Sequence, residues 1–120
     1  MIIYLDTSAI VKRYIAENGS DIVNSMYEDA LNGKVSLSFS LWNICESLCV
    51  FDKYYRRGWI SRKDYEYIQL WFKLETKRLI KLKVLRIVPL RSRIVVKTWN
   101  LISKYHIYVA EHYRLFQLKL

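Results

Sequence analysis

The chain is poor in residues that interrupt or cross-link a fold. Its 120 residues include two cysteines, one proline and three glycines, and no linker-like or repetitive tract. Cys45 and Cys49 are four residues apart, which suits neither a disulfide framework nor a zinc motif, so we expect small core residues of a helix. No apolar run approaches the roughly 18 residues that span a bilayer, and the N-terminus lacks signal-peptide features. We expect one cytoplasmic globular domain, residues 1–120, without membrane contact.

Apolar and basic side chains are abundant. Hydrophobic residues make up 52% of the chain and aromatic residues 15%, which is enough for a packed core and excludes disorder as a class. The net charge is +9; residues 1–50 hold six acids and three Lys/Arg, and residues 51–120 hold five acids and seventeen. This asymmetry is typical of proteins that bind nucleic acid or acidic proteins. Solvated helix faces in a basic proteome give the same pattern, and the sequence does not separate the two.

Apolar periodicity, with helix caps at Ser40 and Ser61 and Pro89 closing the third strand, predicts an α/β chain. Lys12 and Arg13 are expected outside the apolar face of the first helix. We expect strands at residues 2–5, 35–39 and 84–88, and helices at 8–16, from 20 to a stop at Gly33, and at 41–57, 61–83, 91–104 and 107–120. The helix at 41–57 is expected to bury Leu41, Ile44, Cys45, Leu48, Cys49 and Tyr55. Strands separated by helices, with no hairpin signal, favour a parallel sheet covered by helices. Three strands are few for such a sheet, because its edges need protection.

The first eight residues carry the strongest local signal. An isoleucine-rich run meets Asp6 and then two hydroxyl residues, which predicts a fully buried strand with Thr7 or Ser8 capping the next helix. Ligand sites of parallel α/β sheets lie at the carboxyl ends of the strands, so Asp6 is a candidate for chemistry. Helix capping by Asp6 is the simpler explanation of the same position. The presence of further acids at the same site would favour a chemical role over capping alone.

Three acids, Asp6, Glu46 and Glu111, lie among apolar neighbours, where an unpaired carboxylate is costly to bury. A shared divalent cation would compensate their charge, and carboxylate oxygens suit Mg²⁺ or Mn²⁺. A metal beside a basic surface indicates phosphodiester hydrolysis, in which the cation activates water while Lys and Arg hold the nucleic-acid backbone. The three acids are far apart in sequence, so their spacing alone gives only weak support for a shared metal site.

The same residues carry a resemblance to a known family. The segment Ile3-Tyr4-Leu5-Asp6-Thr7-Ser8-Ala9 resembles the opening motif of PIN domains. Glu46, after a strand and a serine cap, is similar to their second acidic position, and His106-Ile107-Tyr108-Val109-Ala110-Glu111 resembles the third. The expected order of helices and strands over residues 1–120 resembles the prokaryotic VapC-like toxins in particular.

The resemblance implies a Mg²⁺- or Mn²⁺-dependent ribonuclease of a toxin–antitoxin system, usually a homodimer and often neutralised by a cognate antitoxin. Asp6, Glu46 and Glu111 would be the catalytic metal ligands. Ser8 would occupy the family's small polar position beside the first acid, toward the RNA substrate. These assignments follow from the family and not from the spacing of the residues.

The chain departs from the family pattern in two ways. Glu111 stands where the family has Asp, and its extra methylene moves the carboxylate by about 1.5 Å. PIN domains also continue into a strand that brings a fourth acid beside strand one, and we expect this chain to lack it. An open edge at residues 2–5 and an apolar last helix then predict self-association. The alternative hypothesis is therefore an impaired, truncated relative that serves as an oligomerisation, antitoxin-binding or RNA-binding module.

The two histidines complete the candidate residues. His112 follows Glu111 on the expected last helix, where sequence neighbours point in different directions, so we expect a surface residue. His106 precedes that helix and is expected to pack or to form a hydrogen bond. Neither is predicted to be catalytic, and the sequence has no Ser/His/Asp relay or glycine-rich phosphate loop.

Overall fold

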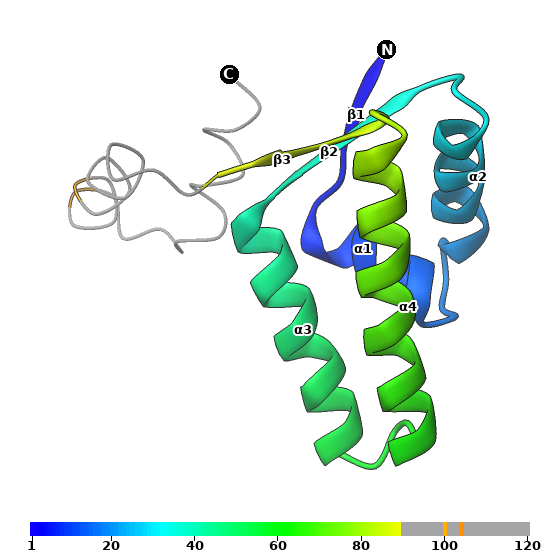
Figure 1. Cartoon of the computed structure of the whole chain (residues 1–120). Helices are drawn as coiled ribbons and strands as arrows, with labels where there is room; N and C mark the ends of the chain where they lie inside the picture. Colours follow the sequence, from blue (N-terminus) through cyan, green and yellow to red (C-terminus); the bar gives the residue numbers. More distant parts are fainter. Residues whose placement is uncertain (90–99, 101–103, 105–120) are drawn as a thin grey trace.

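The computed structural model describes residues 1–89, Asn100 and Lys104 (Figure 1). In residues 1–89 the elements are β1 (Ile2–Tyr4), α1 (Thr7–Tyr14), α2 (Ser20–Leu31), β2 (Ser36–Ser40), α3 (Leu41–Arg56), α4 (Arg62–Lys81) and β3 (Leu85–Val88). All three predicted strands and the first four predicted helices are confirmed to within a few residues. Apart from Asn100 and Lys104, the helices expected at 91–104 and 107–120 lie outside the described residues, as do Glu111, His106 and His112.

The three strands form a parallel sheet in the order β1-β2-β3. Ile3 pairs with Leu37, and Leu37 pairs with Leu85. The backbone N–H of Leu5 also donates to the carbonyl of Ser38 at 2.8 Å, so the ladder continues one residue past β1. The predicted parallel sheet is therefore confirmed, and β2 is its central strand.

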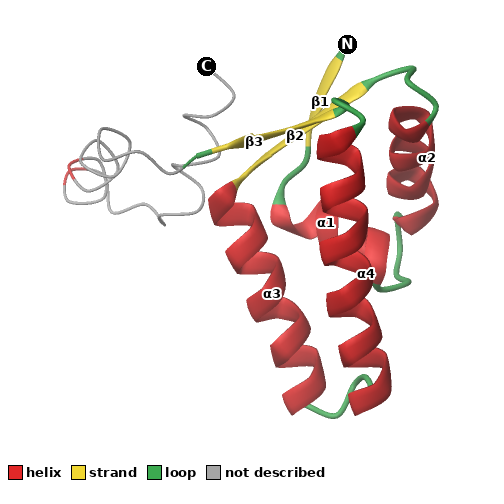
Figure 2. Ribbon diagram, in the orientation of Figure 1, coloured by secondary structure: helices red, strands yellow, loops and turns green. Residues whose placement is uncertain are grey.

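Side chains alternate between the two faces of the sheet. The row of Ile3, Leu37 and Leu85 packs into the core, and the four helices lie on one side of the sheet (Figure 2). The first strand was expected to be fully buried, but Ile2 is 71% exposed. That expectation was wrong because β1 pairs only with β2 among the described strands and its alternate residue faces away from the core.

Two serine caps begin the long helices as the sequence predicts. Ser40 accepts from the backbone N–H of Asn43 at 3.1 Å, and the Asn43 side chain accepts from the Ser40 N–H at 3.0 Å, which completes a capping box. Ser61 accepts from the N–H of Asp64 at 3.0 Å. After the C-terminal end of α2, Gly33 has φ +75°, a conformation that glycine adopts without steric cost.

Helices α3 and α4 form an antiparallel hairpin that extends away from the sheet (Figure 1). Phe51 and Phe72 meet edge to face with ring centroids 5.8 Å apart, and Tyr55 stacks on Tyr65 at 4.9 Å. The longest helix, α4, has 20 residues. Neither it nor any other described helix is both long enough and apolar enough to cross a membrane.

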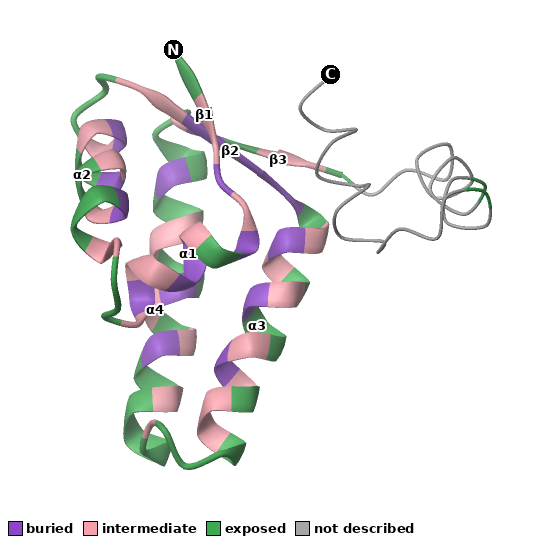
Figure 3. Cartoon of the chain, turned by 180° about the vertical axis from the view of Figure 1, so that it is seen from behind, coloured by how far each residue is buried: buried purple, intermediate pink, exposed green. Residues whose placement is uncertain are grey.

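The buried face of α3 differs from the expected one. Its buried residues are Asn43, Ser47 and Phe51, whereas Cys45 and Cys49 are exposed (Figure 3). The prediction that the two cysteines are core residues is therefore wrong. The Ser47 hydroxyl donates to the Asn43 carbonyl at 2.7 Å, so this side of the helix is buried without leaving that hydroxyl unpaired.

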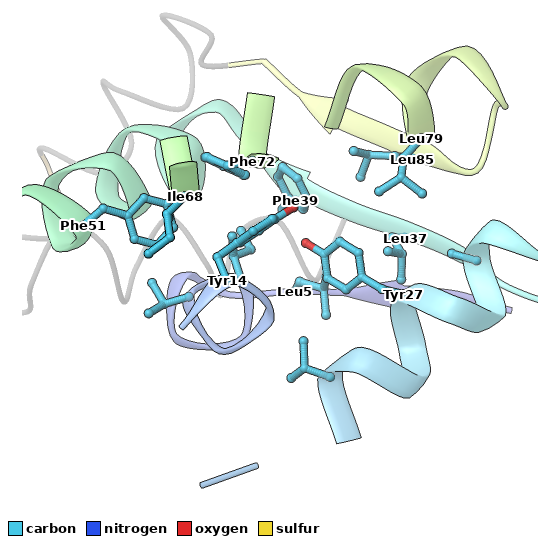
Figure 4. Close-up of a cluster of buried hydrophobic side chains, with 14 residues drawn as sticks. Leu5, Tyr14, Tyr27, Leu37, Phe39, Phe51, Ile68, Phe72, Leu79 and Leu85 are labelled. Carbon is cyan, nitrogen blue, oxygen red and sulfur yellow. The ribbon is translucent and has the colours of Figure 1, made fainter. Parts of the chain in front are cut away.

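An aromatic cluster around Tyr14 fills the space between the helices (Figure 4). The ring centroid of Tyr14 lies 6.2 Å from that of Tyr27, 6.1 Å from that of Phe51 and 5.1 Å from that of Phe72, mostly in edge-to-face geometry. Such pairs stabilise by about 0.5–1.5 kcal/mol beyond the area they bury. Tyr14 therefore joins α1 to α2, α3 and α4.

Arg13 lies beside this cluster, although the sequence predicts that it faces solvent, outside the apolar face of the first helix. Its side chain is only 10% exposed and forms a bidentate contact with Glu75, with Nε–Oε1 and Nη2–Oε2 distances of 2.9 and 2.8 Å. Its Nη1 donates to Asn24 at 3.1 Å, and the guanidinium lies 4.9 Å from the ring centroid of Tyr27. The prediction of a solvent-facing Arg13 is corrected because Glu75, from a distant helix, compensates its charge.

The burial of Tyr14 makes stability sensitive to alkaline pH. Burial raises the pKa of the Tyr14 hydroxyl well above its usual value, and neighbouring Tyr27 and Glu75 raise it further. In the unfolded chain a tyrosine titrates near about pH 10, so this residue's stabilising effect is fully present below that pH and is lost above it. We expect the free energy of unfolding to fall by up to about 1.4 kcal/mol per pH unit through Tyr14.

Urea unfolding of the wild type and Tyr14→Phe between about pH 8 and about pH 11 measures this effect. The phenylalanine variant should lose stability less steeply with rising pH. Tyr67→Phe is the matched control, because Tyr67 is 64% exposed and should leave the slope unchanged. Equal slopes for the wild type and Tyr14→Phe would contradict the assignment.

Candidate functional site

The candidate site lies at the carboxyl edge of the sheet, where β1 leads into α1 and β2 leads into α3 (Figure 1). Because β1 and β2 are adjacent and parallel, the residues that follow them emerge at the same edge. Asp6 follows β1, and Glu46 lies in the second turn of α3. This topology brings together two acids that are 40 residues apart in sequence.

Asp6 is the N-cap of α1. Its Oδ1 accepts from the Ala9 backbone N–H at 2.9 Å and from the Ser8 hydroxyl at 2.8 Å. The expected cap, Thr7 or Ser8, is therefore wrong, since both are helical residues. The first turn of a helix favours a negative charge, which stabilises the ionised carboxylate at this position. Capping and ligand binding are compatible, because a carboxylate has more than one acceptor site.

Thr7 links Glu46 to the turn that carries Asp6. Its hydroxyl donates to Glu46 Oε1 at 2.6 Å, a short contact across the gap between α1 and α3. Thr7 is 9% exposed, and Glu46 is half-buried. Since Thr7 directly follows Asp6, this bond holds the Glu46 carboxylate beside the turn that carries Asp6.

A buried amide supports this link. Asn43, 2% exposed, donates from Nδ2 to the Thr7 hydroxyl oxygen at 3.1 Å. Its Oδ1 accepts from the hydroxyls of Tyr4 at 2.7 Å and Ser40 at 2.8 Å. Asn43 from α3 thus joins three other elements in one hydrogen-bonded network next to the acids. Its partners are Tyr4 from β1, Ser40 from β2 and Thr7 from α1. We call these four residues the Asn43 network.

The donor set of Asp6 and Glu46 fits a hard divalent cation. Both are carboxylates, and each has one oxygen oriented by a hydroxyl, Ser8 for Asp6 and Thr7 for Glu46. Within residues 1–89, Asn100 and Lys104 there is no group of three or more His, Cys, Asp or Glu side chains that could hold a metal ion. Glu111, the third expected ligand, lies outside this part of the chain. Residues 1–89 therefore supply two of the three expected donors.

The sequence pointed to Asp6, Glu46 and Ser8 but not to the residues that position them. Tyr4 and Thr7 were assigned to a strand and a cap, and Asn43 was not predicted to have a role. The spacing of Ser40 and Asn43 is that of a capping box, which could have identified Asn43 as a hydrogen-bond partner of Ser40. Nothing local predicts that Thr7 contacts Glu46, because 39 residues separate them.

The basic character predicted for the second part of the chain appears as exposed side chains. Residues 51–89 contain eleven Lys/Arg and four acids. On α4, Lys73, Lys77, Arg78 and Lys81 are all exposed, and Lys83 and Arg86 continue the series toward and into β3. We call these six residues the α4–β3 basic segment.

No family model matches this chain, and no curated protein is significantly similar to it. What residues 1–89 define is a small α/β fold with a three-stranded parallel sheet and four helices. The features of this fold that bear on function are the acids at the carboxyl edge, the Asn43 network and the α4–β3 basic segment.

Proposed function

We propose that this chain is a PIN-like endoribonuclease of the VapC toxin type, which hydrolyses RNA phosphodiester bonds with Mg²⁺ or Mn²⁺. The observation that carries the proposal is the 2.6 Å hydrogen bond from Thr7 to Glu46, directly after the helix cap Asp6. It holds the Glu46 carboxylate beside the turn that carries Asp6, at one sheet edge and in the order that the resemblance to PIN domains implies. Glu111 as the third acid is part of the proposal.

The proposed roles follow from the contacts. Asp6, Glu46 and Glu111 would hold the cation, which when bound activates water and offsets charge on the phosphoryl oxygens. Ser8 and the Ala9 amide orient Asp6, and Thr7 orients Glu46, so these residues position the ligands. Ser8 is exposed and therefore also accessible to RNA.

The α4–β3 basic segment supports an RNA substrate over a small molecule. Its exposed cations lie along a helix and the strand that follows, an arrangement that suits a phosphate backbone. RNA affinity should then fall steeply with rising salt. A homodimer and a cognate antitoxin belong to the same proposal, and the exposed edge at Ile2 is one surface available for such a partner.

The test is cleavage of single-stranded RNA and transfer RNA with Mn²⁺ or Mg²⁺, comparing the wild type with Asp6→Asn. Asparagine caps helices as well as aspartate does, so this variant removes a charged ligand while keeping α1. We expect cleavage to fall by about 100-fold or more, since metal chemistry contributes several kcal/mol to the reaction. Asp21→Asn, in the first turn of α2, is the matched control and should retain activity.

Equal cleavage by the wild type and Asp6→Asn would remove Asp6 from the mechanism. Calorimetric titration with Mn²⁺ then separates the alternatives. An impaired relative should show no metal binding that depends on Asp6. A plain RNA-binding domain should bind RNA in a salt-dependent way and ignore a chelator. Either result would replace the nuclease proposal.

A further inference from the structure

Cys45 and Cys49 form a feature of α3 that the proposed nuclease does not use. They are the only two cysteines of the chain, and both are exposed. Residues four apart on a helix lie on one face, with Cβ atoms about 5–6 Å apart. At 100° per residue, the opposite face of α3 carries the buried residues Asn43, Ser47 and Phe51. The two thiols therefore lie side by side at the protein surface.

The helix spacing determines which chemistry the pair can perform. A disulfide needs Cβ atoms about 3.5–4.5 Å apart, so the two thiols cannot join while α3 is intact. Zinc normally takes four ligands, and the described residues offer no third His, Cys, Asp or Glu that could complete a metal group here. Two metal–sulfur bonds of about 2.3 Å in a straight line place the sulfurs about 4.6 Å apart, which rotation about the Cα–Cβ bonds allows.

We propose that Cys45 and Cys49 form a two-coordinate site for one soft monovalent cation of the Cu(I) class. Thiolate sulfur is the ligand that Cu(I) selects, and a linear geometry needs no further donor. Binding would release the thiol protons and leave a complex with a net charge of −1.

The surroundings of the pair suit such a complex. Leu41 and Leu48 are 44% and 38% exposed, and they flank the thiols with apolar surface. Lys53 is exposed and lies four residues after Cys49, on the same side of α3, where its ammonium offsets the negative charge. Asp52, three residues after Cys49, is engaged by Arg56 at 2.7 Å, and Glu46, three residues before Cys49, accepts from Thr7 at 2.6 Å, so both neighbouring acids already have partners.

The experiment is anaerobic titration of the reduced protein with Cu(I) buffered by bicinchoninate. We expect one Cu(I) per chain, a monomer count unchanged by binding, and a higher melting temperature because the ion cross-links one turn of α3. Cys45→Ser and Cys49→Ser should each lower the affinity by at least about 100-fold, because each removes one of two soft ligands. Both substitutions are at exposed positions, so the variants should remain folded.

A respaced pair provides the sharpest control. Cys49→Ser/Lys53→Cys keeps two exposed thiols on the same side of α3 but separates them by about 12 Å along the axis. It should bind no better than the single variants. Equal affinity of the respaced pair, two ions per chain, or binding that occurs only with dimerisation would overturn the proposal. None of these measurements depends on RNA cleavage, so failure here is distinguishable from failure of the nuclease proposal.

Discussion

Replacing Glu75 by leucine is expected to lower the free energy of unfolding by about 3–5 kcal/mol, because it leaves the buried Arg13 charge with only the exposed Glu28 carboxylate, 3.7 Å away. The two side chains are each 10% exposed, and the Nη2–Oε2 distance is 2.8 Å. Glu75 Oε1 also accepts from the Tyr14 hydroxyl at 3.0 Å, so the substitution removes a second buried partner. Chemical denaturation with constant m-value measures the change.

The double variant Arg13→Leu/Glu75→Leu tests whether charge pairing causes the loss. It should be more stable than the sum of the single changes predicts, with a coupling energy of about 1–3 kcal/mol. Glu66→Leu is the matched control on the same helix. Its partner Arg62 is 3.2 Å away, but the side chains are 79% and 64% exposed, so the change should stay within about 0.5 kcal/mol. Similar losses for Glu66→Leu and Glu75→Leu would contradict the account.

Replacing Asn43 by alanine is the second change with a large expected effect, a loss of about 2–4 kcal/mol. It deletes the acceptor of the Tyr4 and Ser40 hydroxyls and the donor to Thr7, all within the Asn43 network. It also removes the capping box of α3. The Tyr4 and Ser40 hydroxyls would then lose this acceptor, which water cannot easily replace inside the protein.

The same variant links stability to the proposed site. Since Thr7 positions Glu46, loss of the Asn43 contact should lower Mn²⁺ affinity of the folded protein by about 10–100-fold. Asn32→Ala is the control, because Asn32 is the exposed C-cap residue of α2 and should change stability by less than about 0.5 kcal/mol. An Asn43→Ala protein as stable as the wild type would show that the network does not hold α3 in place.

Local signals in the sequence were sufficient to predict the order of elements. Ser40 and Ser61 were predicted as helix caps, and both accept from the backbone N–H three residues later. Pro89 was expected to close the third strand, and β3 ends at Val88. Each of these features depends on residues a few positions apart, which is the range over which capping and apolar periodicity act.

The orientation of α3 could not be obtained in that way. The apolar pattern favours the side that carries Leu41, Cys45 and Leu48, yet the structure buries Asn43 and Ser47. A count of apolar residues assumes that burying a polar side chain is unfavourable. It takes no account of hydrogen-bond partners from other helices and strands. Here those partners exist, so the polar side packs inward and the cysteines remain at the surface.

The site was predictable to the extent that parallel strands align their carboxyl ends. That rule placed Asp6 correctly at the sheet edge and made Glu46 a reasonable neighbour. The bonds that position the acids cross 36 and 39 residues of sequence, and the Arg13–Glu75 contact crosses 62. Contacts of that range depend on how the helices pack, which no local pattern specifies.

The strand order has a further consequence for how the acids meet. Since β1, β2 and β3 follow one another across the sheet, the chain advances in one direction and, within residues 1–89, never reverses. Crossovers of one hand that all advance the same way leave their helices on a single face. Reversal of direction is what opens a backbone crevice in larger sheets of this type. In residues 1–89 no such reversal occurs. The hydrogen bond from Thr7 to Glu46 instead brings residues of the two neighbouring crossovers together.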